Sequence, residues 1–192
     1  MKQQGRWQDY LLLARVDKPT GTLLLLFPTY WALWLASEGS LSPFYFFLFT
    51  IGTFSMRSAG CIINDISDSD IDKYVERTKD RPVTAGYISK KQALLTAALF
   101  CFIAFLCLLP LNWLSWKLSL VALFLCCTYP RMKRFFSIPQ LYLGFAFSFG
   151  IIMAYAAVLN TVPRVSWLIY LATIFWTVGY DTVYAISDKP ND

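Results

Sequence analysis

One short stretch of this chain, residues 63–82, gathers side chains that can do chemistry. Its sequence, INDISDSDIDKYVERTKDRP, holds six of the chain's 12 acidic residues. On a helix, where each residue turns by about 100°, Asn64, Asp65, Asp68 and Asp72 fall on one face. Carboxylates that share a face repel one another unless a cation neutralises them. The spacing therefore predicts a cation-binding face.

Two interpretations of this face stay open. A bound Mg²⁺ would suit it, because Mg²⁺ takes one or two carboxylates together with substrate phosphate oxygens. The alternative is a solvated helix end whose acids pair with nearby cations of the same stretch. The metal site is favoured, because the acids continue an apolar segment and a second acidic group follows another such segment.

The second acidic group lies in YDTVYAISDKPND, where Asp188 and Asp192 are four residues apart. Pro190 makes a regular helix between them doubtful. Asp181, about two turns earlier, is either a further site residue or a paired structural carboxylate. Two acidic groups that face each other across a bundle of helices could hold Mg²⁺ ions with a diphosphate between them.

Basic side chains near the acids could bind that diphosphate. Arg77 and Arg81 directly follow the first group, and an arginine can donate two hydrogen bonds to phosphate oxygens. Tyr129 and Lys133 are spaced by four residues in YPRMKR. Taken alone, the basic residues of YPRMKR are also explained by membrane topology.

Arg57 is unusual because it lies inside an apolar segment. Burying an arginine in a membrane span costs about 2.5–3.5 kcal/mol on insertion scales, and such residues face the interior of a bundle. Arg57 either pairs with Asp65 or Asp68, or extends toward the interface, or binds an acidic group of a substrate.

The composition indicates what must position these residues. The chain is 57% hydrophobic and 15% charged, against about 25% charged in average soluble domains. Six apolar segments approach the roughly 20 residues that cross a bilayer. We expect an all-α, polytopic transmembrane helical bundle that forms a single domain over residues 1–192. The six segments are Pro19–Ala36, Phe44–Ile63, Ala93–Leu109, Trp113–Tyr129, Gln140–Leu159 and Ser166–Ile186.

Charge predicts the orientation of this bundle. The connections on one side carry 14 of the 17 lysines and arginines, against two on the other side, which places the first side in the cytoplasm. That side holds the N-terminus, residues 63–92 and 130–139, and the C-terminus. Residues 7–14 suit an amphipathic helix on the membrane surface. No cleavable signal peptide is evident. Nucleic acid is not an expected partner, because acids interrupt the cations, and the lack of histidine excludes imidazole catalysis.

These motifs resemble the UbiA superfamily of intramembrane prenyltransferases. The family signature NDxxDxxxD is matched by Asn64, Asp65, Asp68 and Asp72, and the second signature, DxxxD, by Asp188 and Asp192. A YxxxK element is matched by Tyr129 and Lys133. The stretch RVDKPTGTLLLLFPTYWALWLA looks like the branch of the family whose acceptor is 4-hydroxybenzoate.

The resemblance implies a helical bundle with a central cavity that opens to lipid, in the bacterial inner membrane. It implies Mg²⁺-dependent transfer of a polyprenyl group from its diphosphate to the ring carbon ortho to the phenol of 4-hydroxybenzoate, in ubiquinone biosynthesis. Mg²⁺ and diphosphate would be held by the aspartates of both signatures, helped by Arg77, Arg81 and Lys133, with Tyr129 near the leaving group. Arg57 and Asn64 would hold the acceptor. Asp181 is a further candidate.

The chain departs from the family pattern in length. Family members continue for about three more spans, giving nine, so we expect this chain to be truncated after six. Alternatives to the expected activity are a UbiA-type transferase with another acceptor, or an inactive fragment. A transporter is disfavoured. Its charged residues would follow a pathway through the bilayer midplane, whereas here they gather at the cytoplasmic ends of the apolar segments. A purely structural subunit would tolerate Asp65→Asn.

Overall fold

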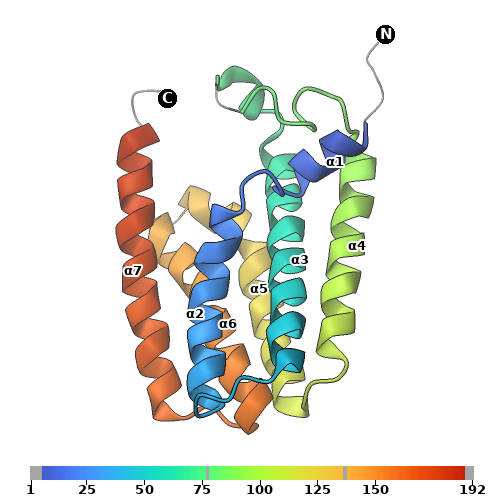
Figure 1. The fold of residues 1–192 in the computed structure, drawn as a ribbon. Helices are drawn as coiled ribbons and strands as arrows, with labels where there is room; N and C mark the ends of the chain where they lie inside the picture. Colours follow the sequence, from blue (N-terminus) through green and yellow to red (C-terminus); the bar gives the residue numbers. More distant parts are fainter. Residues whose placement is uncertain (1–5, 77, 136–137, 189–192) are drawn as a thin grey trace.

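The computed structural model describes residues 6–76, 78–135 and 138–188, and all regular structure in these ranges is helical (Figure 1). This confirms the expected all-α class. The elements, in chain order, are α1 (Trp7–Leu13), α2 (Thr20–Ala36), α3 (Pro43–Asp68), the 3-10 helix η1 (Asp72–Tyr74), α4 (Lys90–Leu108), α5 (Trp113–Phe135), α6 (Pro139–Leu159) and α7 (Arg164–Asp188).

Helices α2 to α7 match the six predicted apolar segments, with differences at their ends. α3 continues past Ile63 to Asp68, and α5 continues past Tyr129 to Phe135. In the described residues, α3, α4 and α6 are long and apolar enough to cross a membrane. The 17 residues of α2 rise only about 26 Å, against roughly 30 Å of hydrocarbon. That α2, α5 and α7 also cross the membrane stays a prediction.

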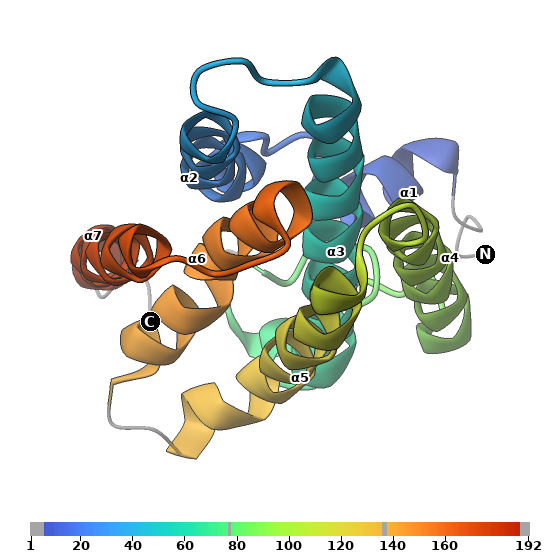
Figure 2. The ribbon, with the colours of Figure 1, turned by 90° about the horizontal axis from the view of Figure 1, so that it is seen from below.

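The long helices run side by side, and α1 lies across one end of them (Figure 1). Viewed from below, α6 lies between α2, α5 and α7, while α4 packs on the opposite side of α3 (Figure 2). The segment that connects α3 to α4 lies at the same end as α1 (Figure 1). All the residues of the first acidic group are therefore placed at one end of the bundle.

Local sequence explains several helix boundaries. Pro43 and Pro139 occupy the first turns of α3 and α6, where a missing amide hydrogen costs nothing. Ser89 caps α4: its Oγ accepts from the Gln92 amide at 3.2 Å, and the Gln92 Oε1 accepts from the Ser89 amide at 2.9 Å. Pro28 lies inside α2 and removes the amide that would bond to the carbonyl four residues earlier.

Small residues allow α2 and α6 to pack closely. The buried cluster between them includes Ala32, Leu33, Ile151 and Ala154. At Gly150 an added Cβ would lie 2.3 Å from the Thr29 Oγ1, so a side chain at this position would push the two helices apart. Close approach through small residues is a common basis of helix association in membranes.

A second buried cluster fixes α1 to the bundle. Leu13 is fully buried and packs with Ile62 of α3 and Ile88 of the connecting segment. The Ser58 Oγ also donates to the carbonyl oxygen of Ala14 at 3.0 Å. Trp7, at the other end of α1, is 70% exposed. α1 is thus an amphipathic helix at the end of the bundle, as predicted for residues 7–14.

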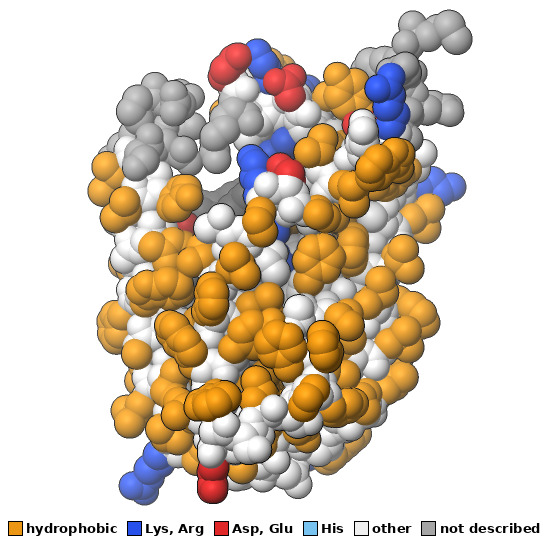
Figure 3. Space-filling model, viewed as in Figure 1, with side chains coloured by type: hydrophobic (Ala, Val, Ile, Leu, Met, Phe, Trp, Pro, Cys, Tyr) orange, Lys and Arg blue, Asp and Glu red, His pale blue; other side chains and the backbone are white. Residues whose placement is uncertain are grey.

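The surface separates by residue type (Figure 3). Hydrophobic side chains cover the visible sides of the bundle, and charged side chains gather at the end that carries α1 and the α3–α4 connection. Large hydrophobic residues are exposed along the helices, among them Phe47, Leu95, Phe124 and Phe175. A surface of this kind is stable in lipid rather than in water.

Candidate active site

A cavity of about 1140 Å³ runs through the bundle from its charged end. At that end it is lined by Arg15, Arg57, Asp65 and Arg81, and farther along by aliphatic and aromatic side chains. Lys117 lies at the other end, with its Nζ 5.7 Å from the centre of the Trp113 ring. Among the described residues, α7 contributes none to the lining. The cavity therefore joins a polar head region to a long apolar region.

Asp65, in the last turns of α3, is the centre of the polar end. Its side chain is 1% exposed, and one nitrogen of Arg15, Nη2, donates to both carboxylate oxygens, at 2.7 and 2.8 Å. Arg81 Nη1 lies 3.1 Å from Asp65 Oδ1. Two guanidinium groups thus compensate one buried carboxylate, which without them would be costly to bury.

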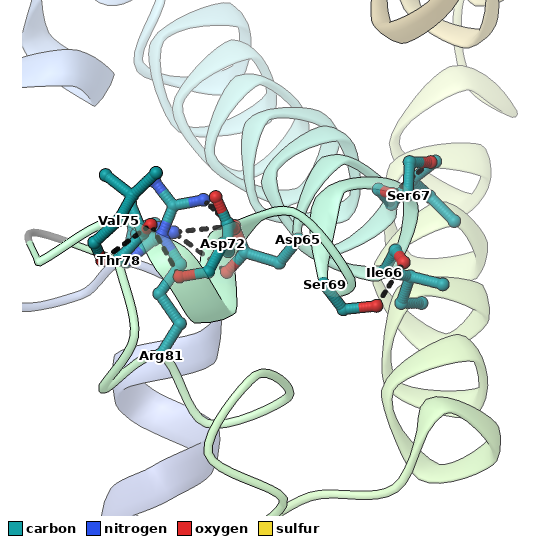
Figure 4. Close-up of polar contacts among 10 residues, drawn as sticks. Asp65, Ile66, Ser67, Ser69, Asp72, Val75, Thr78 and Arg81 are labelled. Atoms are coloured by element: carbon teal, nitrogen blue, oxygen red, sulfur yellow. Dashed lines mark hydrogen bonds and ion pairs between the residues drawn. The ribbon is translucent and has the colours of Figure 1, made fainter. Parts of the chain in front are cut away.

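Asp72 reaches the same arginine from outside the helix (Figure 4). Its Oδ2 accepts from Arg81 Nη1 at 2.8 Å, and the Thr78 Oγ1 donates to its carbonyl oxygen at 3.2 Å. The prediction that one helix carries Asp65, Asp68 and Asp72 on one face is wrong, because α3 ends at Asp68 and Asp72 begins η1. The chain turns back instead, and this brings Asp72 to Asp65.

The polar end fits Mg²⁺ only together with a substrate. In the described ranges, no group of three or more potential ligands lies close enough to hold a metal by itself. Asp65 and Asp72, however, converge on a single cationic nitrogen of Arg81. Mg²⁺ commonly takes one or two carboxylates and completes its shell with water and phosphate oxygens. Two converging carboxylates beside arginines match that pattern.

Asp70 provides a contrast within the same motif. It lies on the surface and pairs with Lys73 at 3.1 Å and with Lys90 at 3.2 Å. These hydrogen bonds, first that from Lys73, lower the pKa of the Asp70 carboxyl below its ordinary value. Asp70 is thus a surface ion-pair residue and, unlike Asp65, does not line the cavity.

Arg57 and Asn64 both line the cavity from α3. Arg57 does not pair with Asp65, which is taken by Arg15 and Arg81. Among the described residues, its Nη2 donates to the carbonyl oxygen of Lys18, at 3.4 Å. Its Nη1 is buried and has no hydrogen-bond partner among the described residues. The guanidinium therefore carries unused donors beside the cavity.

A further polar group comes from three helices. Tyr129 of α5 lines the cavity, and Asp68 of α3 and Asp181 of α7 lie close enough for their charges to act on its hydroxyl. Asp181 is partly buried. The structure thus brings these three predicted residues near one another, beside rather than within the Asp65–Arg81 cluster.

For the remaining predicted residues, either the whole residue or its side chain lies outside the described part of the structure. Arg77 and Asp192 lie outside the described residues. Lys133 and Asp188 belong to α5 and α7, but their side chains are outside the described part. Their predicted roles stay predictions.

Arg15 is the functional candidate that sequence reasoning missed. It precedes α2 in the corner after α1 and has a positive φ of 59°. Its partner Asp65 is 50 residues away, so no local spacing connects the two. The available signal was its position: a cation just before the first apolar segment must lie at the same membrane side as the acidic group.

Comparison with known proteins identifies the family. The model of the UbiA prenyltransferase family matches residues 25–192. The chain belongs to the UbiA prenyltransferase family. The long apolar helices of the described residues and their apolar surface are those of an integral membrane protein, in agreement with its UbiA structural relatives.

Curated members of the UbiA family are similar over this whole chain. A 4-hydroxybenzoate octaprenyltransferase of Neisseria meningitidis (strain FAM18) is 59% identical over 192 residues, which is 100% of this chain and 65% of that protein. Another, of Herminiimonas arsenicoxydans, is 54% identical over 98% of this chain and 66% of that protein. The chain thus spans about two thirds of the length of these relatives.

Solved UbiA structures share the fold. A UbiA homolog from Aeropyrum pernix K1 matches with a TM-score of 0.76 at 30% identity, covering 89% of this chain and 65% of that one. A UbiA homolog from Archaeoglobus fulgidus, solved with GPP and Mg²⁺, matches with a TM-score of 0.74 at 20% identity, covering 96% and 65%. The second likeness concerns the fold alone.

Proposed function

We propose that this chain is a 4-hydroxybenzoate polyprenyltransferase of ubiquinone biosynthesis. It would transfer a polyprenyl group from polyprenyl diphosphate to the ring carbon ortho to the phenol of 4-hydroxybenzoate. The single observation that carries the proposal is the cavity, in which a cluster of two carboxylates and two arginines opens onto a long apolar region. The similarity to curated 4-hydroxybenzoate octaprenyltransferases supports it.

The proposed role of each residue follows from the chemistry of its side chain. Asp65, Asp68 and Asp72, with Asp188 and Asp192, would hold Mg²⁺ and through it the diphosphate. Bound Mg²⁺ supplies positive charge to a leaving diphosphate. Arg15 and Arg81 lie where they can donate hydrogen bonds to diphosphate oxygens, and Arg77 and Lys133 are proposed to add further cations. Such donors stabilise the negative charge that develops on the leaving group.

The acceptor is placed deeper in the cavity. Arg57 lies eight residues before Asp65 on α3, a rise of about 12 Å, and its unused donors suit the carboxylate of 4-hydroxybenzoate. Asn64 would hydrogen-bond the phenol, and Tyr129 would face the leaving group. The ring carbon then bonds to the allylic carbon as its C–O bond breaks, the electron pair of that bond leaves with diphosphate, and the ring proton passes to the released diphosphate.

The apolar region would hold the prenyl chain. Its walls are aliphatic and aromatic, and they include Phe105 and Trp116, which form an edge-to-face pair with ring centres 5.7 Å apart. A hydrocarbon chain needs no specific hydrogen bonds, so such walls suffice to exclude water from an allylic cation. Membrane lipid would border this region.

We further propose that residues 1–192 form one domain in the bacterial inner membrane, with α1 and the α3–α4 connection in the cytoplasm. The charged side chains at that end of the bundle support this orientation (Figure 3). The water-soluble acceptor would then enter from the cytoplasm, and the prenyl donor from the lipid.

Membranes that contain the full chain test the proposal. They should form prenylated 4-hydroxybenzoate from octaprenyl diphosphate when Mg²⁺ is present, detected by mass spectrometry, and should form none after chelation. A panel of acceptors would include 4-hydroxybenzoate, its methyl ester, other hydroxylated aromatic acids and glycerol phosphate. Transfer to another acceptor alone would replace the proposed substrate, and transfer to none would refute the activity for this chain.

A further inference from the structure

Gly21, in the first turn of α2, faces the guanidinium of Arg57 at very short range. A Cβ built on Gly21 would lie 2.3 Å from Arg57 Nη2 and 3.0 Å from both Cζ and Nε. The Nε–Nη2 edge of the guanidinium is therefore the part that lies nearest Gly21. Both residues line the cavity. Any larger residue at position 21 would have to move the guanidinium.

The surroundings of Arg57 show why its position matters. A guanidinium has five N–H donors, and within the described part of the chain Arg57 makes one hydrogen bond, to the Lys18 carbonyl oxygen at 3.4 Å. Nη1 is buried without a partner among the described residues. A buried donor left unpaired is costly, so a carboxylate that enters beside it would be bound firmly.

We propose that Gly21 is the positioning residue of an aromatic-carboxylate subsite, in which it sets where Arg57 presents its donors. The inference deepens the proposed function, on which it rests for the identity of the acceptor. Gly21 acts through Arg57 and the adjacent Lys18 carbonyl, which together fix one edge of the guanidinium. The other edge is left for the two oxygens of a carboxylate, the geometry in which arginine binds most specifically.

The substitution Gly21→Ala tests this without disrupting the fold. The group it displaces is the end of a flexible side chain, so the unfolding temperature should stay within the range of the control Gly179→Ala, whose Cβ meets nothing within 4 Å. In nanodiscs, calorimetric titration with 4-hydroxybenzoate should show about tenfold weaker binding for Gly21→Ala, the effect of losing one hydrogen bond to a charged group. Binding of the neutral methyl ester should not change.

A double variant separates positioning from a merely structural effect. Lysine has no planar fork to collide with a methyl group, so Gly21→Ala combined with Arg57→Lys should bind the acid no more weakly than Arg57→Lys alone. Normal acid binding by Gly21→Ala, or losses that add in the double variant, would overturn the inference.

The same titration distinguishes this inference from the proposed function. If the wild-type protein binds the acid through Arg57 but transfers no prenyl group, the subsite is supported and the proposed prenyl-transfer activity is refuted. A wild-type protein that binds acid and ester equally overturns the subsite, even if prenyl transfer is measured.

Discussion

At the scale of single residues, the polar end of the cavity is organised by shared partners. Arg81 joins Asp65 to Asp72, and Arg15 occupies both oxygens of Asp65. A substitution of any one of these four residues therefore also removes a partner of another. The surface residue Asp70, five positions from Asp65, provides a comparison from the same motif.

The first prediction separates the buried aspartates from Asp70. Asp65→Asn and Asp72→Asn each remove a carboxylate that converges on Arg81, and should lower prenyl transfer by about 100-fold, the usual cost of losing one charge-stabilising contact. Asp70→Asn should stay within about twofold of wild type, because its exposed pairs with Lys73 and Lys90 contribute little. Initial rates in membranes at saturating Mg²⁺ measure this. Equal losses in all three variants would contradict it.

The second prediction concerns Arg15. Arg15→Ala leaves the buried Asp65 carboxylate with Arg81 alone, and should cost about 2 kcal/mol of unfolding free energy, less than the 3–5 kcal/mol of a fully broken buried pair. Thermal unfolding in detergent would show a lowered midpoint. Lys79→Ala, which breaks only the exposed pair with Glu76, is the control and should leave the midpoint unchanged. An unshifted midpoint for Arg15→Ala would show that the pair is not stabilising.

At the scale of elements, small residues decide how closely helices approach. Gly150 brings α6 against Thr29 of α2, and the Thr29 hydroxyl is itself held by a 2.8 Å bond to the Leu25 carbonyl oxygen. The contact lies next to the cavity, since both residues line it. A change in this packing would therefore alter the cavity as well as stability.

The third prediction follows from that contact. Gly150→Ala should destabilise the protein by about 1–3 kcal/mol, the usual cost of overpacking, because its Cβ would lie 2.3 Å from the Thr29 Oγ1. Gly179→Ala should be neutral or slightly stabilising, because alanine favours helices and its Cβ meets open space. Chemical unfolding curves of both variants provide the comparison. A neutral Gly150→Ala would mean that α2 and α6 separate easily.

The elements also show how far the sequence alone could lead. Apolar length and the charges that follow each segment located six helices and the end of the bundle where Asp65 lies. The position of Asp72 could not be read in this way, because the break after Asp68 results from the chain turning back toward Arg81. The Arg15–Asp65 and Gly21–Arg57 contacts join residues 50 and 36 positions apart, and such contacts are fixed by tertiary packing.

At the scale of the whole molecule, the two ends of the bundle differ in charge. The net charge is +5, and charged side chains gather at the end with α1 (Figure 3). Within that end, Arg15, Arg81, Asp65 and Asp72 balance one another. The charges of these four side chains therefore cancel one another within the protein itself.

The fourth prediction uses this balance. Chelation of divalent ions should not lower the unfolding temperature of the ligand-free protein, because its buried carboxylates already have arginine partners. Mg²⁺ together with diphosphate should raise it by mass action, since both would bind the folded state. Differential scanning fluorimetry with and without chelator measures both effects. A lower midpoint after chelation alone would show that metal is part of the resting fold.

The fifth prediction concerns orientation. Tyr74, which is 90% exposed, should be cytoplasmic, and Ser40, in the α2–α3 connection, should lie on the outer side. In intact spheroplasts an impermeant maleimide should label Ser40→Cys, and should label Tyr74→Cys only after lysis. The unsubstituted chain, with its own five cysteines, gives the background. Labelling of Tyr74→Cys before lysis would reverse the proposed orientation.

Pro28 has a consequence for how the cavity can admit a ligand. It divides α2 into a first half, which carries Gly21 and Leu25 along the cavity wall, and a second half, whose Ala32 and Leu33 are fixed in the buried cluster with α6. A proline inside a helix leaves one carbonyl without its amide partner, and helices bend at such points. We therefore expect any motion of the first half relative to the second to be centred at Pro28. A flat aromatic ring could thus enter and leave by the motion of two helical turns, with no whole span displaced through the bilayer.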